Sequence, residues 1–252
     1  MSAASSPADR ARRTGPRELS VRPDRRYRVL WGANRTLVRL LFDVRASGLE
    51  RWPSAPFCLV ANHHNGWDPL LVMAVAPFDP RISWFGPREA DFSHGFKNRV
   101  MAFFGGVIPY HPQMTTLTSA VRAVRRVFAA GGVLGIFAEG RVGFRESELL
   151  PFEDGAVVFA STAEVPIVPC AIVGSSWLWF RRRVDVRFGG PIPTRGVRSR
   201  EARAELEAVV RAAMLELMPD TEPAVPRRRP LRWLGDLLTG ADDLARREGS
   251  DG

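Results

Sequence analysis

Lysine and cysteine are scarce in this sequence of 252 residues. Lys97 is the one lysine among 36 basic residues, and Cys58 and Cys170 are the two cysteines. Two cysteines exclude a disulfide-rich scaffold. Because both lie inside apolar runs, we expect buried thiols in a reducing compartment and not a thiol nucleophile, which needs polar surroundings to lower its pKa.

The chain also lacks a run of about 20 apolar residues, the length that spans a bilayer. Its first residues have no apolar core of a signal peptide, so we expect no secretory signal. The nearest candidate for a membrane segment, 27–44, is interrupted by arginines. We predict that residues 29–48 form an amphipathic helical segment in the membrane interface, with Trp31 near the headgroups. The alternative is an ordinary helix that packs on the core.

Positive charge is concentrated in residues 1–28, which hold eight arginines against three acidic residues in a chain of net charge +9. This composition predicts a disordered basic arm. Anionic lipid headgroups are the partner we expect, at about 1 kcal/mol for each basic residue near the surface. The alternative is an arm that only keeps the protein soluble. We expect no nucleic-acid partner, because zinc-ligand spacings, RNA-binding aromatic signatures and basic heptads are missing.

Apolar runs typical of strands alternate along the chain with segments of helical periodicity. This order predicts an α/β fold with a mixed, largely parallel sheet covered by helices on both faces. Residues 49–218 would form that domain, followed by a Pro/Arg-rich linker and amphipathic tail at 219–252. The predicted strands are 57–61, 82–86, 106–109, 133–137, 166–173 and 184–188, and the predicted helices are 69–76, 96–104, 115–130, 153–164 and 200–217.

A histidine followed by four residues and an aspartate stands directly after the predicted strand 57–61, at His63 and Asp68. This spacing lets the carboxylate fold back onto the imidazole, where it orients the ring and stabilises the imidazolium. The pair is therefore predicted to be a general base that activates a hydroxyl. The neighbouring His64 raises the alternative of a metal site, but no further ligands are suitably spaced, so we expect no metal.

Further blocks follow in order: Phe137-Ala138-Glu139-Gly140, Leu150-Pro151-Phe152 and Val165-Pro166-Ile167-Val168-Pro169. With the Asn62-His63 block, this succession resembles the PlsC-type glycerolipid acyltransferases, which include the lysophosphatidate and glycerol-3-phosphate acyltransferases. The resemblance runs from about residue 49 to 193. It implies the fold of that family, His63 and Asp68 as catalytic residues, and substrate binding by Asn62, Glu139, Gly140 and Pro169.

The departures from the family pattern concern the acceptor. Pro112 stands where an arginine that helps bind the acceptor's phosphate usually falls, and acidic residues follow Pro151-Phe152 where a basic one is common. The usual Thr-Arg after Glu-Gly is replaced by Arg141-Val142. Each change removes or displaces positive charge that a phosphate would need. Arg141 is our candidate for that phosphate, with an ordinary surface cation as the alternative. The other cations that could compensate are Arg88, Lys97 and Arg145.

These features predict an O-acyltransferase that moves a fatty acyl group from acyl-CoA or acyl carrier protein to lysophosphatidate. We expect no cofactor and a peripheral position on the cytoplasmic face of the cell membrane, where the lipid surface and the lysophospholipid acceptor are partners. The alternatives are a different lysophospholipid, a glycolipid or another hydroxylated acceptor, or a catalytically silent lipid-binding member of the fold.

Overall fold

A seven-stranded sheet forms the centre of the molecule, with strand order β1-β7-β6-β2-β5-β3-β4. The computed structural model describes residues 22–87, 107–110, 116–225, 231 and 233. Strand β6 is antiparallel to β7, and every other neighbouring pair is parallel. The strands are β1 (Asp43–Ser47), β2 (Phe57–Ala61), β3 (Ile82–Pro87), β4 (Val107–Tyr110), β5 (Val133–Phe137), β6 (Ile167–Val173) and β7 (Arg183–Phe188).

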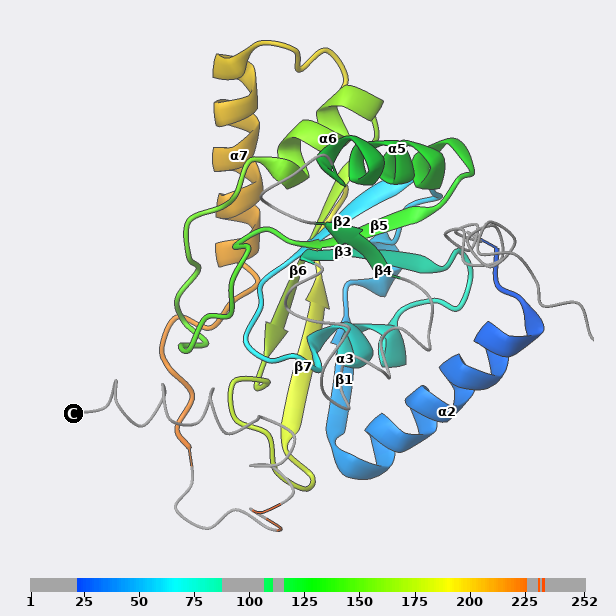
Figure 1. Cartoon of the computed structure of the whole chain (residues 1–252). Helices are drawn as coiled ribbons and strands as arrows, with labels where there is room; N and C mark the ends of the chain where they lie inside the picture. Colours follow the sequence, from blue (N-terminus) through cyan, green and yellow to red (C-terminus); the bar gives the residue numbers. More distant parts are fainter. Residues whose placement is uncertain (1–21, 88–106, 111–115, 226–230, 232, 234–252) are drawn as a thin grey trace, which may run out of the picture.

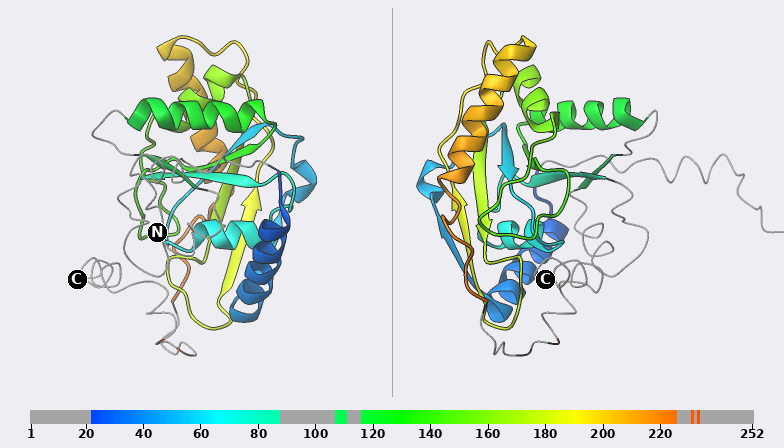
Figure 2. Two further views of the ribbon diagram at one scale, coloured as in Figure 1. Left: turned by 45° about the vertical axis from the view of Figure 1, so that its right-hand side comes forward. Right: turned by 90° about the vertical axis from the view of Figure 1, so that its left-hand side faces the viewer.

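Helices cover both faces of this sheet (Figure 1). The α-helices are α2 (Arg25–Leu41), α3 (Asp68–Val75), α5 (Thr116–Ala129), α6 (Gly155–Ala163) and α7 (Arg200–Leu215). Helices α2 and α3 pack on one face and α5, α6 and α7 on the other (Figure 2), and each face has its own apolar core. Side chains of β2 alternate between the two: Phe57 and Leu59 join one core, Cys58 and Val60 the other. The predicted α/β class with a largely parallel sheet is confirmed.

Six of the seven strands lie where the sequence predicts them, and β1 is the exception. Residues 43–47 belong to the segment predicted as an amphipathic helix, but α2 ends at Leu41 and β1 pairs with β7, with Asp43 opposite Arg183. This part of the prediction was wrong because β1 is an edge strand with alternating charges, which hides its strand character. The helix also begins at Arg25, inside the predicted basic arm. Residues 1–21 of that arm, the predicted helix 96–104 and most of the predicted tail lie outside the described residues.

Helix α2 has one face on the core and one in solvent. Its buried face includes Tyr27, and Asn34 donates a hydrogen bond to the carbonyl of Leu70 in α3 (2.9 Å). Trp31, predicted to lie near lipid headgroups, packs edge-on against Phe78 instead, with ring centroids 5.4 Å apart. Of the helices in the described ranges, none has the length and apolar character needed to cross a membrane.

Candidate active site

The site is built at the carboxyl end of β2, and Asn62 fixes the point where the chain leaves the sheet. Its side-chain amide donates to the carbonyl of Ile172 (3.0 Å) and its amide oxygen accepts from the N–H of Ile172 (2.7 Å). Asn62 is fully buried, and both ends of its amide are used in this way. It therefore positions the following residues, and its contact with substrate stays a prediction.

His63 and Asp68 meet as their spacing predicts. Nδ1 of His63 lies 2.9 Å from Oδ2 of Asp68, at the first residue of α3. The same oxygen accepts hydrogen bonds from the backbone N–H groups of His64 (2.7 Å) and Asn65 (2.8 Å). Burial acts to raise the pKa of Asp68, but the hydrogen bond and charge of His63, with His64 and the N–H of Asn65, lower it overall. The carboxylate is thus held ionised against the imidazole.

The His63 ring is also held from one side. It stacks on Phe137 at a centroid distance of 4.1 Å, and Phe137 in turn stacks on Trp84 at 4.8 Å. The His63 side chain is 19% exposed, and Nε2 has no hydrogen-bond partner among the described residues. A histidine oriented at Nδ1 and open at Nε2 can take a proton from a hydroxyl bound beside it.

Glu139 lies at the end of β5, where it joins two loops. Its Oε1 accepts from the backbone N–H of His63 and its Oε2 from that of Leu150, each at 3.0 Å. Burial raises the pKa of Glu139, and these two hydrogen bonds and the nearby histidines only partly offset that effect. Since each oxygen accepts a hydrogen bond in a buried position, Glu139 holds the loop of His63 in place, and its contact with the acceptor stays a prediction.

Gly140 and Arg141, two more of the predicted binding residues, follow Glu139 in the chain. Gly140 has a left-handed backbone (φ +64°), and a Cβ there would lie 2.8 Å from Cγ of Glu153. Arg141, which follows it, is exposed in the loop whose Gly143 N–H donates to the carbonyl of His63 (2.7 Å). These residues are therefore in or beside the site.

Pro169 is buried within β6, paired with Val60 and packed on Gly189, and its role in substrate binding stays a prediction. Arg88, with Lys97 and Pro112, lies outside the described residues.

Sequence reasoning missed Glu146. This carboxylate is buried in the loop between β5 and α6, and its Oε2 lies 3.5 Å from Nδ1 of His64. It also accepts from the N–H groups of Gly174 (2.8 Å) and Ser176 (2.7 Å) after β6. No motif marks Glu146, since its partners are distant in sequence. Within the described ranges, no three histidine, cysteine or acidic side chains are grouped as a metal site would need.

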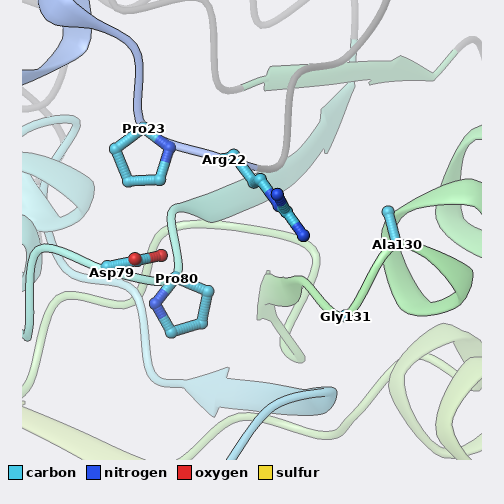
Figure 3. A pocket seen from close by; sticks show the side chains of 6 residues that line it. All are labelled: Arg22, Pro23, Asp79, Pro80, Ala130 and Gly131. Atoms are coloured by element: carbon cyan, nitrogen blue, oxygen red, sulfur yellow. The ribbon is translucent and has the colours of Figure 1, made fainter.

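A hollow of about 470 Å³ lies elsewhere on the molecule (Figure 3). It is lined by residues that precede β3 and β5, including Pro80 and Gly131, and by Arg22 and Pro23. It therefore lies at the amino ends of the parallel strands, whereas His63 follows the carboxyl end of β2. The hollow and His63 therefore lie at opposite ends of the parallel strands.

Comparison with known proteins points to one family. The family model described as Acyltransferase matches residues 43–173. The chain is 25% identical over 152 residues to the 1-acyl-sn-glycerol-3-phosphate acyltransferase of Bacillus subtilis (strain 168), covering 60% of this chain and 72% of that protein. It is 33% identical over 192 residues to 1-acyl-sn-glycerol-3-phosphate acyltransferase alpha of Bos taurus, covering 71% and 64%.

The fold is similar to that of a solved structure. The crystal structure of the 1-acyl-sn-glycerophosphate (LPA) acyltransferase PlsC from Thermotoga maritima superposes with a TM-score of 0.57 at 21% identity. The superposition covers 76% of this chain and 79% of that one. At this identity the similarity bears on the fold, including the sheet from which the site is built.

Proposed function

Because this chain belongs to the acyltransferase family, we propose that it transfers a fatty acyl group from acyl-CoA or acyl carrier protein to lysophosphatidate, giving phosphatidate. The single observation that carries the chemistry is the contact between His63 Nδ1 and Asp68 Oδ2 at 2.9 Å. The acceptor follows from the names of the relatives, which include acyltransferases of 1-acyl-sn-glycerol-3-phosphate.

The reaction needs two substrates and no cofactor. Nε2 of His63 takes the proton of the acceptor hydroxyl as its oxygen attacks the thioester carbonyl carbon. The tetrahedral intermediate collapses, its C–S bond breaks, and the leaving thiolate takes the proton back from His63. An ester and a free thiol result, without an acyl-enzyme. The general-base step contributes about 10²–10⁴-fold, and positioning with oxyanion stabilisation supplies the rest.

Arg141 is the cation we assign to the acceptor's phosphate. It is exposed on the loop that touches His63 through Gly143, and guanidinium is well suited to phosphate. Arg141→Ala should raise KM for lysophosphatidate and leave KM for acyl-CoA unchanged. Arg198→Ala is the matched control, since Arg198 is exposed and pairs with Glu164 near α6. Equal effects of the two variants on KM would remove Arg141 from this role.

A second candidate acceptor lacks phosphate, and the position of Glu153 favours it. Cγ of Glu153 lies 2.8 Å from where a Cβ of Gly140 would be, so a carboxylate borders the loop assigned to phosphate binding. Repulsion from this carboxylate would weaken binding of a phosphate monoester. A neutral lysolipid, a glycolipid or another hydroxylated acceptor would not suffer this cost.

The experiment that tests the proposal is a transfer assay with radiolabelled palmitoyl-CoA and palmitoyl carrier protein. Its acceptors are lysophosphatidate, glycerol-3-phosphate, neutral lysolipids and glycolipids, and His63→Ala is run beside the wild type. Label in phosphatidate that disappears with His63→Ala is the expected result. Label in a phosphate-free product would support the second candidate, and no His63-dependent transfer from either donor would leave the silent lipid-binding alternative.

We also propose that the protein binds the cytoplasmic face of the membrane through α2. Val29, Leu37 and Leu40 are 70%, 51% and 63% exposed, and with Ala33 they follow a spacing of four, four and three residues. This spacing places them on one helical face, opposite the face that packs on α3. An exposed apolar row beside arginines suits a helix in the membrane interface.

Liposome flotation tests this membrane role. The double variant Leu37→Ser/Leu40→Ser should float less well with vesicles that contain anionic lipid. Val209→Ser/Leu215→Ser is the matched control, because these residues are 52% and 45% exposed on α7, across the sheet from α2 (Figure 2). Equal flotation of both double variants and the wild type would argue against α2.

A further inference from the structure

Glu146 is a buried carboxylate in the loop between β5 and α6, and the proposed transfer step does not use it directly. Its two oxygens accept hydrogen bonds from the backbone N–H groups of Ser176 (Oε1, 2.7 Å) and Gly174 (Oε2, 2.8 Å). Burying a carboxylate is unfavourable unless such partners surround it. Glu146 therefore ties its own loop firmly to the segment that follows β6.

The third contact of Glu146 is with the catalytic loop, residues 62–67, which joins β2 to α3 and carries His63. Its Oε2 lies 3.5 Å from Nδ1 of His64, whose ring is fully buried. The same nitrogen lies 3.3 Å from Nδ2 of Asn62. Both contacts thus meet at Nδ1 of His64 and come from different loops. This nitrogen binds the carboxylate when it carries a proton and the amide when it does not.

The backbone of His64 continues this chain of contacts. Its N–H donates to Oδ2 of Asp68 (2.7 Å), the oxygen that also lies 2.9 Å from Nδ1 of His63. A shift of the His64 ring would move this N–H and loosen the carboxylate that orients the catalytic imidazole. Glu146 is therefore linked to His63 by three successive contacts, through His64 and Asp68.

Glu139 and Glu146 contact neighbouring residues of the loop that carries His63. Oε1 of Glu139 accepts from the backbone N–H of His63, while Glu146 faces the ring of His64. Two buried carboxylates from one loop thus hold successive residues of the catalytic loop. Arg182 also contacts this network. Its Nε donates to the carbonyl of Gly174 (3.3 Å), and its positive charge interacts with the carboxylate of Glu146.

We infer that Glu146 is a positioning residue for acyl transfer, which acts through His64 to hold Asp68 and His63 in register. The inference rests on the proposed function, because it concerns the same histidine. A misplacement of about 1 Å at a catalytic group can lower the rate about 10²-fold. Glu146→Gln keeps the size of the side chain but removes its charge and one acceptor. We expect kcat to fall about 10²-fold with both KM values nearly unchanged.

The matched control is Glu148→Gln, an exposed residue two positions further along the same loop. It should keep the kcat of the wild type. A second variant, His64→Gln, removes the imidazole but leaves the bonds of Glu146 to Gly174 and Ser176. It should lower kcat to a similar extent, and the double variant His64→Gln/Glu146→Gln should be no slower than the slower single variant, because both act on one path.

A proton NMR measurement on the full chain separates this inference from the proposed function. The proton between His63 Nδ1 and Asp68 should give a downfield resonance that Asp68→Asn removes. We expect Glu146→Gln to shift or broaden it and Glu148→Gln to leave it unchanged, whether or not the chain transfers acyl groups to any acceptor tested. If Glu146→Gln does not fold, His64→Gln provides the same readout.

The inference is overturned by an unchanged resonance in Glu146→Gln, or by an unchanged resonance in His64→Gln where Glu146→Gln does not fold. A wild-type kcat in an active preparation of Glu146→Gln also overturns it. So does a loss confined to KM, or additive losses in the double variant, since these would mean a role in substrate binding or in stability alone. An inactive wild type that still shows the expected spectral change would contradict the proposed function and support the positioning role.

Discussion

The imidazole of His63 lies nearly parallel to the ring of Phe137, with centroids 4.1 Å apart and an interplanar angle of 16°. Asp68 holds one edge of the imidazole while Phe137 covers one face, so the plane of the ring is fixed as well as its direction. Trp84 extends the stack at 4.8 Å and 10°. The base is thereby supported by the core of one sheet face.

Phe137→Leu should lower kcat about two- to tenfold, because a stacked aromatic pair contributes about 0.5–1.5 kcal/mol. KM should change little. The measurement is steady-state transfer with a thermal unfolding curve for each variant. Phe159→Leu is the control, since Phe159 pairs with Phe85 at 5.2 Å and packs with the core on the other face of the sheet. If it lowers kcat as much, the stack on His63 has no special role.

Gly135→Ala should destabilise the protein by about 1–3 kcal/mol, the usual cost of overpacking a core. A Cβ on Gly135 in β5 would lie 2.6 Å from a ring carbon of Trp84 and 2.8 Å from a methyl of Ile82. Denaturant unfolding measures the change. Gly32→Ala in α2 should stabilise the protein by about 0.4–1 kcal/mol, because nothing lies within 4 Å of its Cβ position. Stabilisation by both substitutions would contradict the packing described here.

The parts of the site that depend on local spacing could be predicted from the sequence. His63 and Asp68 are five residues apart, so a short loop that ends in a helix brings them together whatever the rest of the chain does. The strands that carry the site were equally visible, because five-residue apolar runs such as Phe57–Ala61 are buried on both faces.

The contacts between distant segments could not be predicted. Asn62 meets Ile172 at a separation of 110 residues, and Glu146 meets Ser176 at 30. A buried role for these polar side chains appears only when the sheet order is known. Glu139 was assigned to the acceptor by resemblance, but the sequence did not reveal that it accepts hydrogen bonds from the backbone N–H groups of His63 and Leu150.

Asp68→Asn should lower kcat about 10²–10⁴-fold, the range expected for general-base assistance. Asparagine keeps one oxygen but cannot stabilise the imidazolium, and its NH₂ group would face the backbone donors of the loop. A transfer assay with palmitoyl-CoA measures the loss. Asp185→Asn is the control, because Asp185 lies on β7, where it pairs with Arg183 and Arg187. A full-rate Asp68→Asn enzyme would mean that His63 needs no carboxylate.

Asp68 should also make the protein less stable in acid. Its pKa is lowered by folding, so its contribution to the free energy of unfolding is present above the unfolded-state value of about 4 and is lost as pH falls through the lower folded value. The difference in unfolding free energy between the wild type and Asp68→Asn should therefore shrink as pH falls below about 4. Urea unfolding from neutral pH downward measures it. A difference that stays constant would show that Asp68 is not ionised in the fold.

Glu139 should show the opposite dependence on pH. Folding raises its pKa, chiefly through burial, so the folded state binds this proton more tightly than the unfolded chain does. The wild type should then gain stability relative to Glu139→Gln as pH falls through the raised folded value toward the ordinary value of about 4.3. Glutamine keeps one acceptor for the N–H groups of His63 and Leu150, so the variant serves as a reference that does not titrate at this position. Urea unfolding of both proteins over the same pH series measures the slope. A stability difference that falls in acid, as expected for Asp68, would mean that the hydrogen bonds from His63 and Leu150 outweigh the burial of Glu139.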